Sequence, residues 1–133
     1  MKIIIPELPP TDNHLYGQHN GRKFMYKEGK DWKELSGYCA KQAWKKEISD
    51  KKFRGEVWFY LKRERDVHGS MKVLFDSFEG IVYHNDKQVF NEEAFKVIDD
   101  ESKLNPRVEI YLIEIDNIFI QLKQSLFNCL KKN

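Results

Sequence analysis

Apolar residues recur at the spacing of an amphipathic helix in three segments of this chain. We expect helices over about residues 30–49, 70–79 and 116–130. The stripes that predict them consist of Trp32, Leu35, Cys39 and Ala43, then Met71, Leu74, Phe75 and Phe78, and finally Ile118, Leu122, Leu126 and Cys129. Gly80 follows the second stripe and is expected to end that helix, because glycine adopts the left-handed conformation without strain. Each stripe should face a common core.

Segments rich in β-branched and aromatic residues lie between the expected helices. The strands they predict cover residues 2–6, 56–64, 94–99 and 107–115, with a brief strand or an ordered loop over 22–26. The strand at 56–64 should begin after a break at Gly55. Its Val57, Phe59 and Leu61 alternate with more polar neighbours, which indicates that one face of the strand is buried.

Helices and strands are mixed along the chain, and no repeat or linker divides it. This order predicts an α+β fold with helices packed against a mixed β-sheet. We expect a single domain over residues 1–133, since a chain of this length builds one hydrophobic core.

The composition excludes a disordered chain, and the net charge gives only weak support for nucleic-acid binding. Hydrophobic residues make up 41% of the sequence, and the formal net charge is only +2. The basic residues nevertheless gather in one stretch, which contains Lys41, Lys45, Lys46, Lys51, Lys52, Arg54, Lys62, Arg63 and Arg65. Such a run is most often a solvated helix face, and it can also follow a phosphate backbone.

The two cysteines and the apolar segments indicate the cellular compartment of the protein. Cys39 and Cys129 lie on expected apolar helix faces, so we expect buried, reduced thiols. The opening MKIIIPELPP is interrupted by proline too early for a signal peptide. No apolar run approaches the roughly 20 residues that a membrane span needs. We therefore expect a cytoplasmic protein with no membrane partner.

The stretch ERDVHGSMKVLFDSFEGIVYHNDKQV, residues 64–89, gathers polar groups around the second expected helix. Asp66 precedes the helix and Asp86 follows the loop after it. His68 and Lys72 are four residues apart, so both can lie on one side of its first turn. These groups suit a metal site for phosphodiester cleavage, with the helix N-terminus attracting a phosphate. The alternative is ordinary capping and surface ion pairing, and spacing alone does not decide between the two.

The same stretch resembles the RusA family of Holliday-junction resolvases. That family carries an Asp-x-Asp-Asn element, a lysine one helical turn later, an Asp-containing helix end and a final (Asp/Asn)-Asp-x-Gln-Val element. The matching residues here are Asp66, Lys72, Asp76 and Asn85-Asp86-Lys87-Gln88-Val89. The opening LPPTDNHLY is similar to the family's Pro-Pro-(Ser/Thr)-x-Asn element and places Asn13 at its asparagine. The resemblance runs from about residue 4 to about residue 115.

This resemblance implies a metal-dependent endodeoxyribonuclease that resolves four-way branched DNA by paired symmetric nicks. The implied cofactor is Mg²⁺ or Mn²⁺, held by Asp66, Asp86 and His68. Lys72 would stabilise the charge that develops on the phosphate. The residues expected to contact DNA are Lys62, Arg65, Asn13 and Lys72. Two nicks related by two-fold symmetry also predict a homodimer, with its interface on the aromatic-rich surface that the core leaves unused.

One element departs from the family pattern, because His68 and Gly69 stand where the family usually has aspartate and asparagine. Imidazole suits Mn²⁺ better than Mg²⁺, so His68 is expected to bind metal or to accept a proton. Two rival functions remain open at this point. One is a catalytically weak protein that only binds junctions, and the other is a small module that binds a protein or RNA partner.

Overall fold

A mixed four-stranded sheet forms the centre of the computed structural model, which describes residues 1–115 and 125–131. The strand order is β1-β6-β4-β5, with β1 (Lys2–Ile5), β6 (Arg107–Ile115), β4 (Lys52–Tyr60) and β5 (Val89–Val97). β4 and β5 run parallel, whereas β1–β6 and β6–β4 are antiparallel. The α+β fold with a mixed sheet is therefore confirmed, and β6 has the bounds that its sequence predicts.

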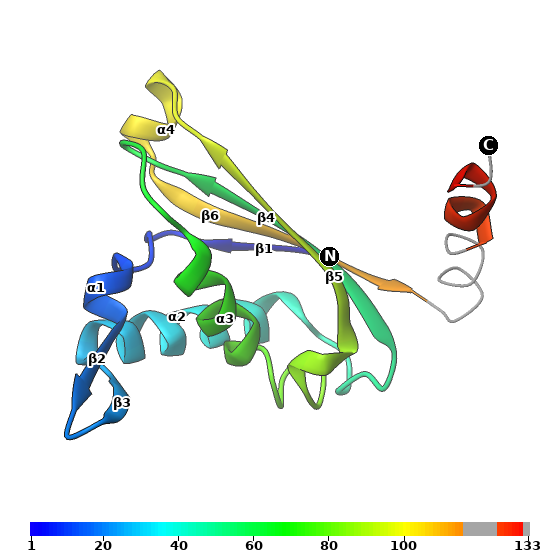
Figure 1. The fold of residues 1–133 in the computed structure, drawn as a ribbon, viewed down its shortest axis with the longest axis horizontal. Coiled ribbons are helices and arrows are strands. Elements are labelled where there is room, and N and C mark those ends of the chain that lie inside the picture. The colour runs from blue at the N-terminus through cyan, green and yellow to red at the C-terminus, as the bar shows by residue number, and fades with distance from the viewer. Residues whose placement is uncertain (116–124, 132–133) are drawn as a thin grey trace.

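Helices α2 (Lys27–Ala43) and α3 (His68–Ser77) cover one face of this sheet, as Figure 1 shows. Alternate residues of β4 face these helices and are buried, among them Phe53, Val57 and Phe59. The predicted break at Gly55 is wrong, because Gly55 lies inside β4. A Cβ there would lie 2.9 Å from the ring of Phe75, so glycine lets α3 pack close to the strand.

The ends of several elements differ from those predicted. β4 ends at Tyr60 rather than at residue 64, so a loop separates it from α3. β5 begins at Val89, five residues earlier than expected, because its main chain pairs with β4 even where its side chains are polar. α2 begins at Lys27 and ends at Ala43, where the Trp44 indole turns to donate to the Glu47 carbonyl at 3.0 Å.

The structure contains five further short elements, of which only β3 lies where the sequence predicts a brief strand or an ordered loop. They are α1 (Asp12–Leu15), β2 (Tyr16–His19), β3 (Arg22–Met25), the 3-10 helix η1 (Asp86–Gln88) and α4 (Asp100–Leu104). β3 shows that the brief strand, and not the ordered loop, is the correct alternative for residues 22–26. Its partner β2 is joined to it by Asn20-Gly21, both at positive φ, which is the conformation that a two-residue hairpin turn requires.

The predicted C-terminal helix is confirmed only in part. Residues 125–131 are helical, but every one of them is exposed. The expectation that Leu126 and Cys129 face a core is therefore wrong, since Leu126 is 63% exposed and Cys129 is exposed as well. Ile118 and Leu122 lie outside the described residues. Cys39 is half-buried in α2, and both thiols are free.

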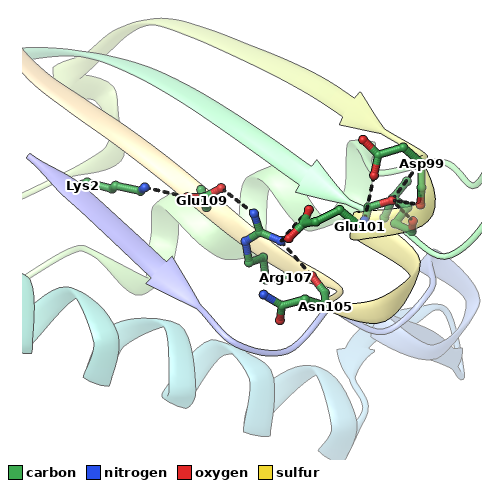
Figure 2. A network of polar contacts seen from close by, with 8 residues as sticks. Lys2, Asp99, Glu101, Asn105, Arg107 and Glu109 are labelled. Atoms are coloured by element: carbon green, nitrogen blue, oxygen red, sulfur yellow. Dashed lines mark hydrogen bonds and ion pairs between the residues drawn. The ribbon is translucent and has the colours of Figure 1, made fainter.

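The sheet face opposite the helices carries an ionic network (Figure 2). Glu109 is only 5% exposed and pairs with Lys2 at 2.7 Å and with Arg107 at 3.3 Å. Arg107 also pairs with Glu101 of α4 at 3.0 Å and lies over the Tyr60 ring, 3.8 Å from its centroid. The network thus ties β1, β6, β4 and α4 together on a face that no other described element covers with a hydrophobic layer.

Candidate active site

The loop after β4 brings Asp66 to the beginning of α3. One carboxylate oxygen of Asp66, Oδ1, accepts a hydrogen bond from the His68 backbone N–H at 3.0 Å. This bond, with a smaller contribution from nearby positive charge, holds the pKa of Asp66 below its ordinary value. Both side chains are exposed. Asp66 therefore accepts from the first N–H of α3 and remains charged and accessible.

Lys72 lies one helical turn further along α3 and contacts two carboxylates. Its Nζ atom is 2.8 Å from Asp76 and 2.5 Å from Asp86. The hydrogen bond to Asp76, followed by that to Asp86, raises the pKa of Lys72 well above its ordinary value. Lys72 in turn lowers the pKa of Asp86. The expected i,i+4 pair of Lys72 and Asp76 is thus present, and Asp86 joins it from a different element.

The chain reverses direction after α3, and this reversal is what carries Asp86 back to Lys72. Gly80 adopts a φ of +78°, and its N–H donates to the Tyr83 carbonyl at 2.7 Å. The Tyr83 ring is buried, and its hydroxyl donates to the Phe75 carbonyl. The turn is therefore anchored against α3 by a buried aromatic side chain.

The Asn85–Val89 segment fixes Asp86 through a reciprocal cap. The Asn85 side chain accepts from the Lys87 N–H at 2.8 Å, and the side-chain oxygen of Gln88, Oε1, accepts from the Asn85 N–H at 3.1 Å. The Gln88 amide also donates to the main-chain oxygens of Ser49 and Lys51. Asparagine and glutamine at these two positions are thus needed to hold the loop in place.

Three carboxylates meet at this loop. Among the described residues, Asp76, Glu79 and Asp86 offer oxygen atoms that all lie within 4.8 Å of one another. The Asp86 N–H also donates to Glu79 at 3.1 Å. Burial, followed by repulsion from Asp86, raises the pKa of Glu92, so a fourth acid, on β5, lies near this group. Clustered carboxylate oxygens are the ligands that Mg²⁺ and Mn²⁺ accept, and the Lys72 ammonium already lies where a cation is attracted.

Comparison with protein families identifies the class of protein to which these residues belong. The family model described as endodeoxyribonuclease RusA matches residues 7–113 of the 133-residue chain. The chain belongs to the RusA family. It is accordingly an endodeoxyribonuclease of the Holliday-junction resolvase type. No curated protein matches the sequence. No helix of the described residues is long and apolar enough to cross a membrane.

The expected RusA site residues fall into two groups along α3. Asp66 and His68 lie at its N-terminal end, whereas Lys72 and Asp86 lie with Asp76 towards its C-terminal end. His68 and Asp76 are eight residues apart, which corresponds to roughly 12 Å along the helix axis. Asp86 therefore forms a cluster of carboxylates with Asp76 and Glu79. Asp66 and His68 are not part of that cluster.

Sequence reasoning did not assign a metal-binding role to Asp76 or Glu79. The RusA pattern gives Asp76 only as the acid near the helix end, and no sequence expectation concerns Glu79. The expected helix over residues 70–79 contains a signal, since residues three apart on a helix share a face and both precede Gly80. In the structure α3 ends at Ser77, and Glu79 lies in the turn that follows. The spacing along the chain does not show that Asp86 lies beside Asp76 and Glu79 in the folded protein.

The residues expected to contact DNA differ in their freedom to do so. Lys62 and Asn13 are exposed, on the loop after β4 and on α1 respectively. Arg65 is half-buried, and its guanidinium donates to the Pro9 carbonyl at 2.5 Å. Burial lowers the pKa of Arg65. The basic run from Lys41 to Arg65 is not one helix face, because it passes from α2 through a loop and β4 into the loop before α3.

Proposed function

We propose that this RusA-family protein is a homodimeric nuclease that uses a divalent metal ion to resolve four-way DNA junctions by paired symmetric nicks. The observation that carries the proposal is the position of Asp86. It meets Lys72 at 2.5 Å and lies within 4.8 Å of two further carboxylates, in a chain whose family cleaves DNA. An accessible group of acids with one lysine is the arrangement that metal-assisted phosphodiester hydrolysis needs.

The proposed cofactor is Mg²⁺ or Mn²⁺. A bound ion of this kind supplies a water of lowered pKa and neutralises charge on the scissile phosphate. Asp76, Glu79 and Asp86 would hold the ion through oxygen atoms, which suits either metal. Asp66 and His68 remain proposed ligands at the other end of α3, where the helix N-terminus favours the phosphate. His68 is alternatively placed to accept a proton there.

Lys72 has a different proposed role, because its ammonium lies between the carboxylates of Asp76 and Asp86. Its raised pKa keeps the ammonium protonated throughout the physiological range. An ammonium beside the reacting phosphate stabilises the negative charge that develops during cleavage. Asp76 and Asp86 would hold a metal ion in place of the Lys72 ammonium, which would then be free to reach the phosphate.

DNA contact is proposed for the exposed surface around this site. Lys62 and Asn13 would position the phosphate backbone, together with Lys72. For Arg65 the proposed contribution is through its free guanidinium edge, since one nitrogen already binds Pro9. Electrostatic contacts of this kind weaken as salt rises, so junction binding should fall steeply with ionic strength. We place this activity in the cytoplasm, where the DNA substrate is.

The proposed dimer interface is the sheet face opposite α2 and α3. The Trp58 and Phe95 rings stack there with centroids 4.3 Å apart. Ile4 and Ile113 are 48% and 47% exposed on the same face. The face also carries both signs of charge in the network of Figure 2, so a second copy related by a two-fold axis is complementary to it. A four-way junction shares that symmetry.

Two measurements on one sample test the proposal. Light scattering should give twice the chain mass of 16.0 kDa, and Trp58→Arg should reduce it to the single mass. A synthetic four-way junction should be cut in the presence of Mg²⁺ or Mn²⁺ and left intact in excess chelator. Tight junction binding without cleavage in either metal would show a catalytically weak binding protein. Equal affinity for junction and linear duplex would instead favour a protein- or RNA-binding module.

A further inference from the structure

The hairpin of β2 and β3 projects from the body of the fold and carries positive charge. Figure 1 shows its turn pointing away from the four-stranded sheet. Residues 13–27, which include the whole hairpin, contain no aspartate or glutamate. Arg22 and Lys23 are exposed next to the turn, and neither forms an ion pair within the part of the chain that the structure describes. In a chain whose net charge is only +2, the hairpin is a local cationic projection.

One face of the hairpin carries two exposed aromatic rings above a glycine. Phe24 and Tyr26 are 40% and 42% exposed, and their rings meet edge to face with centroids 5.0 Å apart. Gly17 is the cross-strand partner of Phe24. A Cβ at Gly17 would lie 2.6 Å from the Phe24 ring and 2.7 Å from the Tyr26 hydroxyl. Glycine at this position therefore lets both rings lie on the hairpin backbone, where a large part of each faces solvent.

The other face of the hairpin lies beside the cluster of three carboxylates. Met25 lines a surface groove of about 820 Å³ together with Asp76 and Glu79. Burial, followed by the negative charge of Asp76, raises the pKa of the Tyr16 phenol, which is half-buried at the base of the hairpin. Lys23 lies over the Tyr16 ring, with its Nζ atom 4.1 Å from the ring centroid. A DNA strand bound at these carboxylates would therefore pass the hairpin.

Branched DNA is the partner that this combination of groups fits. Cations bind phosphates without regard to sequence, and exposed aromatic rings stack on bases that have lost a neighbour. The interior of a linear duplex offers no such base, because each base is stacked on both sides. A four-way junction interrupts stacking where its strands exchange partners. The cations of the hairpin therefore suit any DNA, whereas its aromatic face suits the branch point.

We propose that the β2–β3 hairpin recognises the branch point of the junction. Phe24 and Tyr26 stack on the bases exposed there, and Arg22 and Lys23 bind the adjoining phosphates. The hairpin is thus the element that gives the protein its preference for branched over linear DNA. This inference rests on the proposed junction-resolving function, and it assigns the hairpin a role separate from the carboxylates and from metal binding.

The first test measures binding to a synthetic four-way junction and to a linear duplex of equal base-pair number, in excess chelator so that no cleavage occurs. Phe24→Leu keeps an apolar side chain and removes the aromatic ring. It should weaken junction binding about tenfold and leave duplex binding unchanged, and Tyr26→Leu should do the same. Phe24→Tyr keeps the ring and should bind the junction as the unsubstituted protein does. Phe127→Leu is the matched control, since Phe127 is 54% exposed on the C-terminal helix, and it should change neither affinity.

The second test measures the salt dependence of binding for the charged residues of the hairpin. Arg22→Met and Lys23→Met should weaken binding to junction and duplex alike. Each should reduce the slope of log affinity against log salt by about 1, because each removes one phosphate contact. Lys103→Met is the control, since Lys103 is an exposed lysine on α4, and it should leave the slope unchanged.

The inference is overturned if Phe24→Leu and Tyr26→Leu bind the junction as tightly as the unsubstituted protein, or if they weaken junction and duplex binding equally. A change from dimer to monomer in either variant, read by light scattering, would also overturn it, because the rings would then belong to the dimer interface. In each of these cases the unsubstituted protein still prefers and cuts the junction, so the proposed function stands. An unsubstituted protein with equal affinity for junction and duplex would refute both.

Discussion

Replacing Lys72 by methionine removes one ammonium and keeps most of the length of the side chain. In the folded protein this ammonium contacts Asp76 at 2.8 Å and Asp86 at 2.5 Å. The Lys72 side chain is 62% exposed and the two acids are each 24% exposed, so water screens both pairs. Exposed ion pairs each contribute about 0.2–1 kcal/mol to the free energy of unfolding. The variant also leaves the three clustered acids without the positive charge of Lys72.

The expected loss of stability is therefore small and the expected loss of activity is large. A loss of about 1 kcal/mol lowers the melting temperature of a chain of this size by about 4 °C. The cleavage rate should fall about 10²-fold, which is the usual effect of removing one group that stabilises charge in the transition state. Thermal unfolding followed by circular dichroism measures the first effect, and single-turnover junction cleavage measures the second.

The dependence of stability on pH gives a further check. Lys72 lowers the pKa of Asp86, so the contribution of this pair is present above the pKa of the unfolded carboxyl group and is lost as pH falls through the lower folded value. Lys72 has a raised pKa, so the same contribution is lost at high pH only above the ordinary lysine range. The stability difference between Lys72→Met and the unsubstituted protein should be constant from about pH 5 to 9 and should vanish in strong acid.

A drop in melting temperature well above 10 °C with an unchanged cleavage rate would refute this reasoning. It would mean that Lys72 holds the fold together and takes no part in the reaction. Arg107→Met is a suitable comparison, because Arg107 is an ion-paired residue on the opposite sheet face, with 17% exposure and contacts to Glu109 and Glu101. It should lower stability more than Lys72→Met does.

Three other predictions test the remaining parts of the site and the fold. Asp66→Asn and Asp86→Asn should each abolish cleavage. Junction binding, measured by gel shift, should stay equal or tighten, because each variant loses a negative charge that repels phosphate. Cleavage at the rate of the unsubstituted protein by either variant would show that the residue is not part of the site. His68→Asp should move the preferred ion from Mn²⁺ towards Mg²⁺, as read from cleavage rates in each metal, and unchanged rates would leave His68 with no part in metal choice. Gly55→Ala should cost about 1–3 kcal/mol in urea unfolding, because its methyl group would lie 2.9 Å from the Phe75 ring.

The alternation of apolar residues predicted the strands that pair in the centre of the sheet, and β6 has the expected bounds. The stripe of Leu74, Phe75 and Phe78 likewise predicted the face of α3 that is buried. These features follow from periodicity because a buried face repeats along its own element. The motif residues of the RusA pattern were also visible, since their spacing along the chain is local.

Contacts between distant segments were decided by tertiary structure alone. Gly55 continues β4 because its main chain pairs with both neighbouring strands, and its missing side chain leaves room for Phe75. β5 extends because it pairs with β4. Glu79 joins Asp86 only because the Gly80 turn reverses the chain, and Asp12 reaches Gly69 only because α1 packs on α3. Sequence periodicity reports which face of an element is buried, but the partner of that face is set by packing across the whole fold.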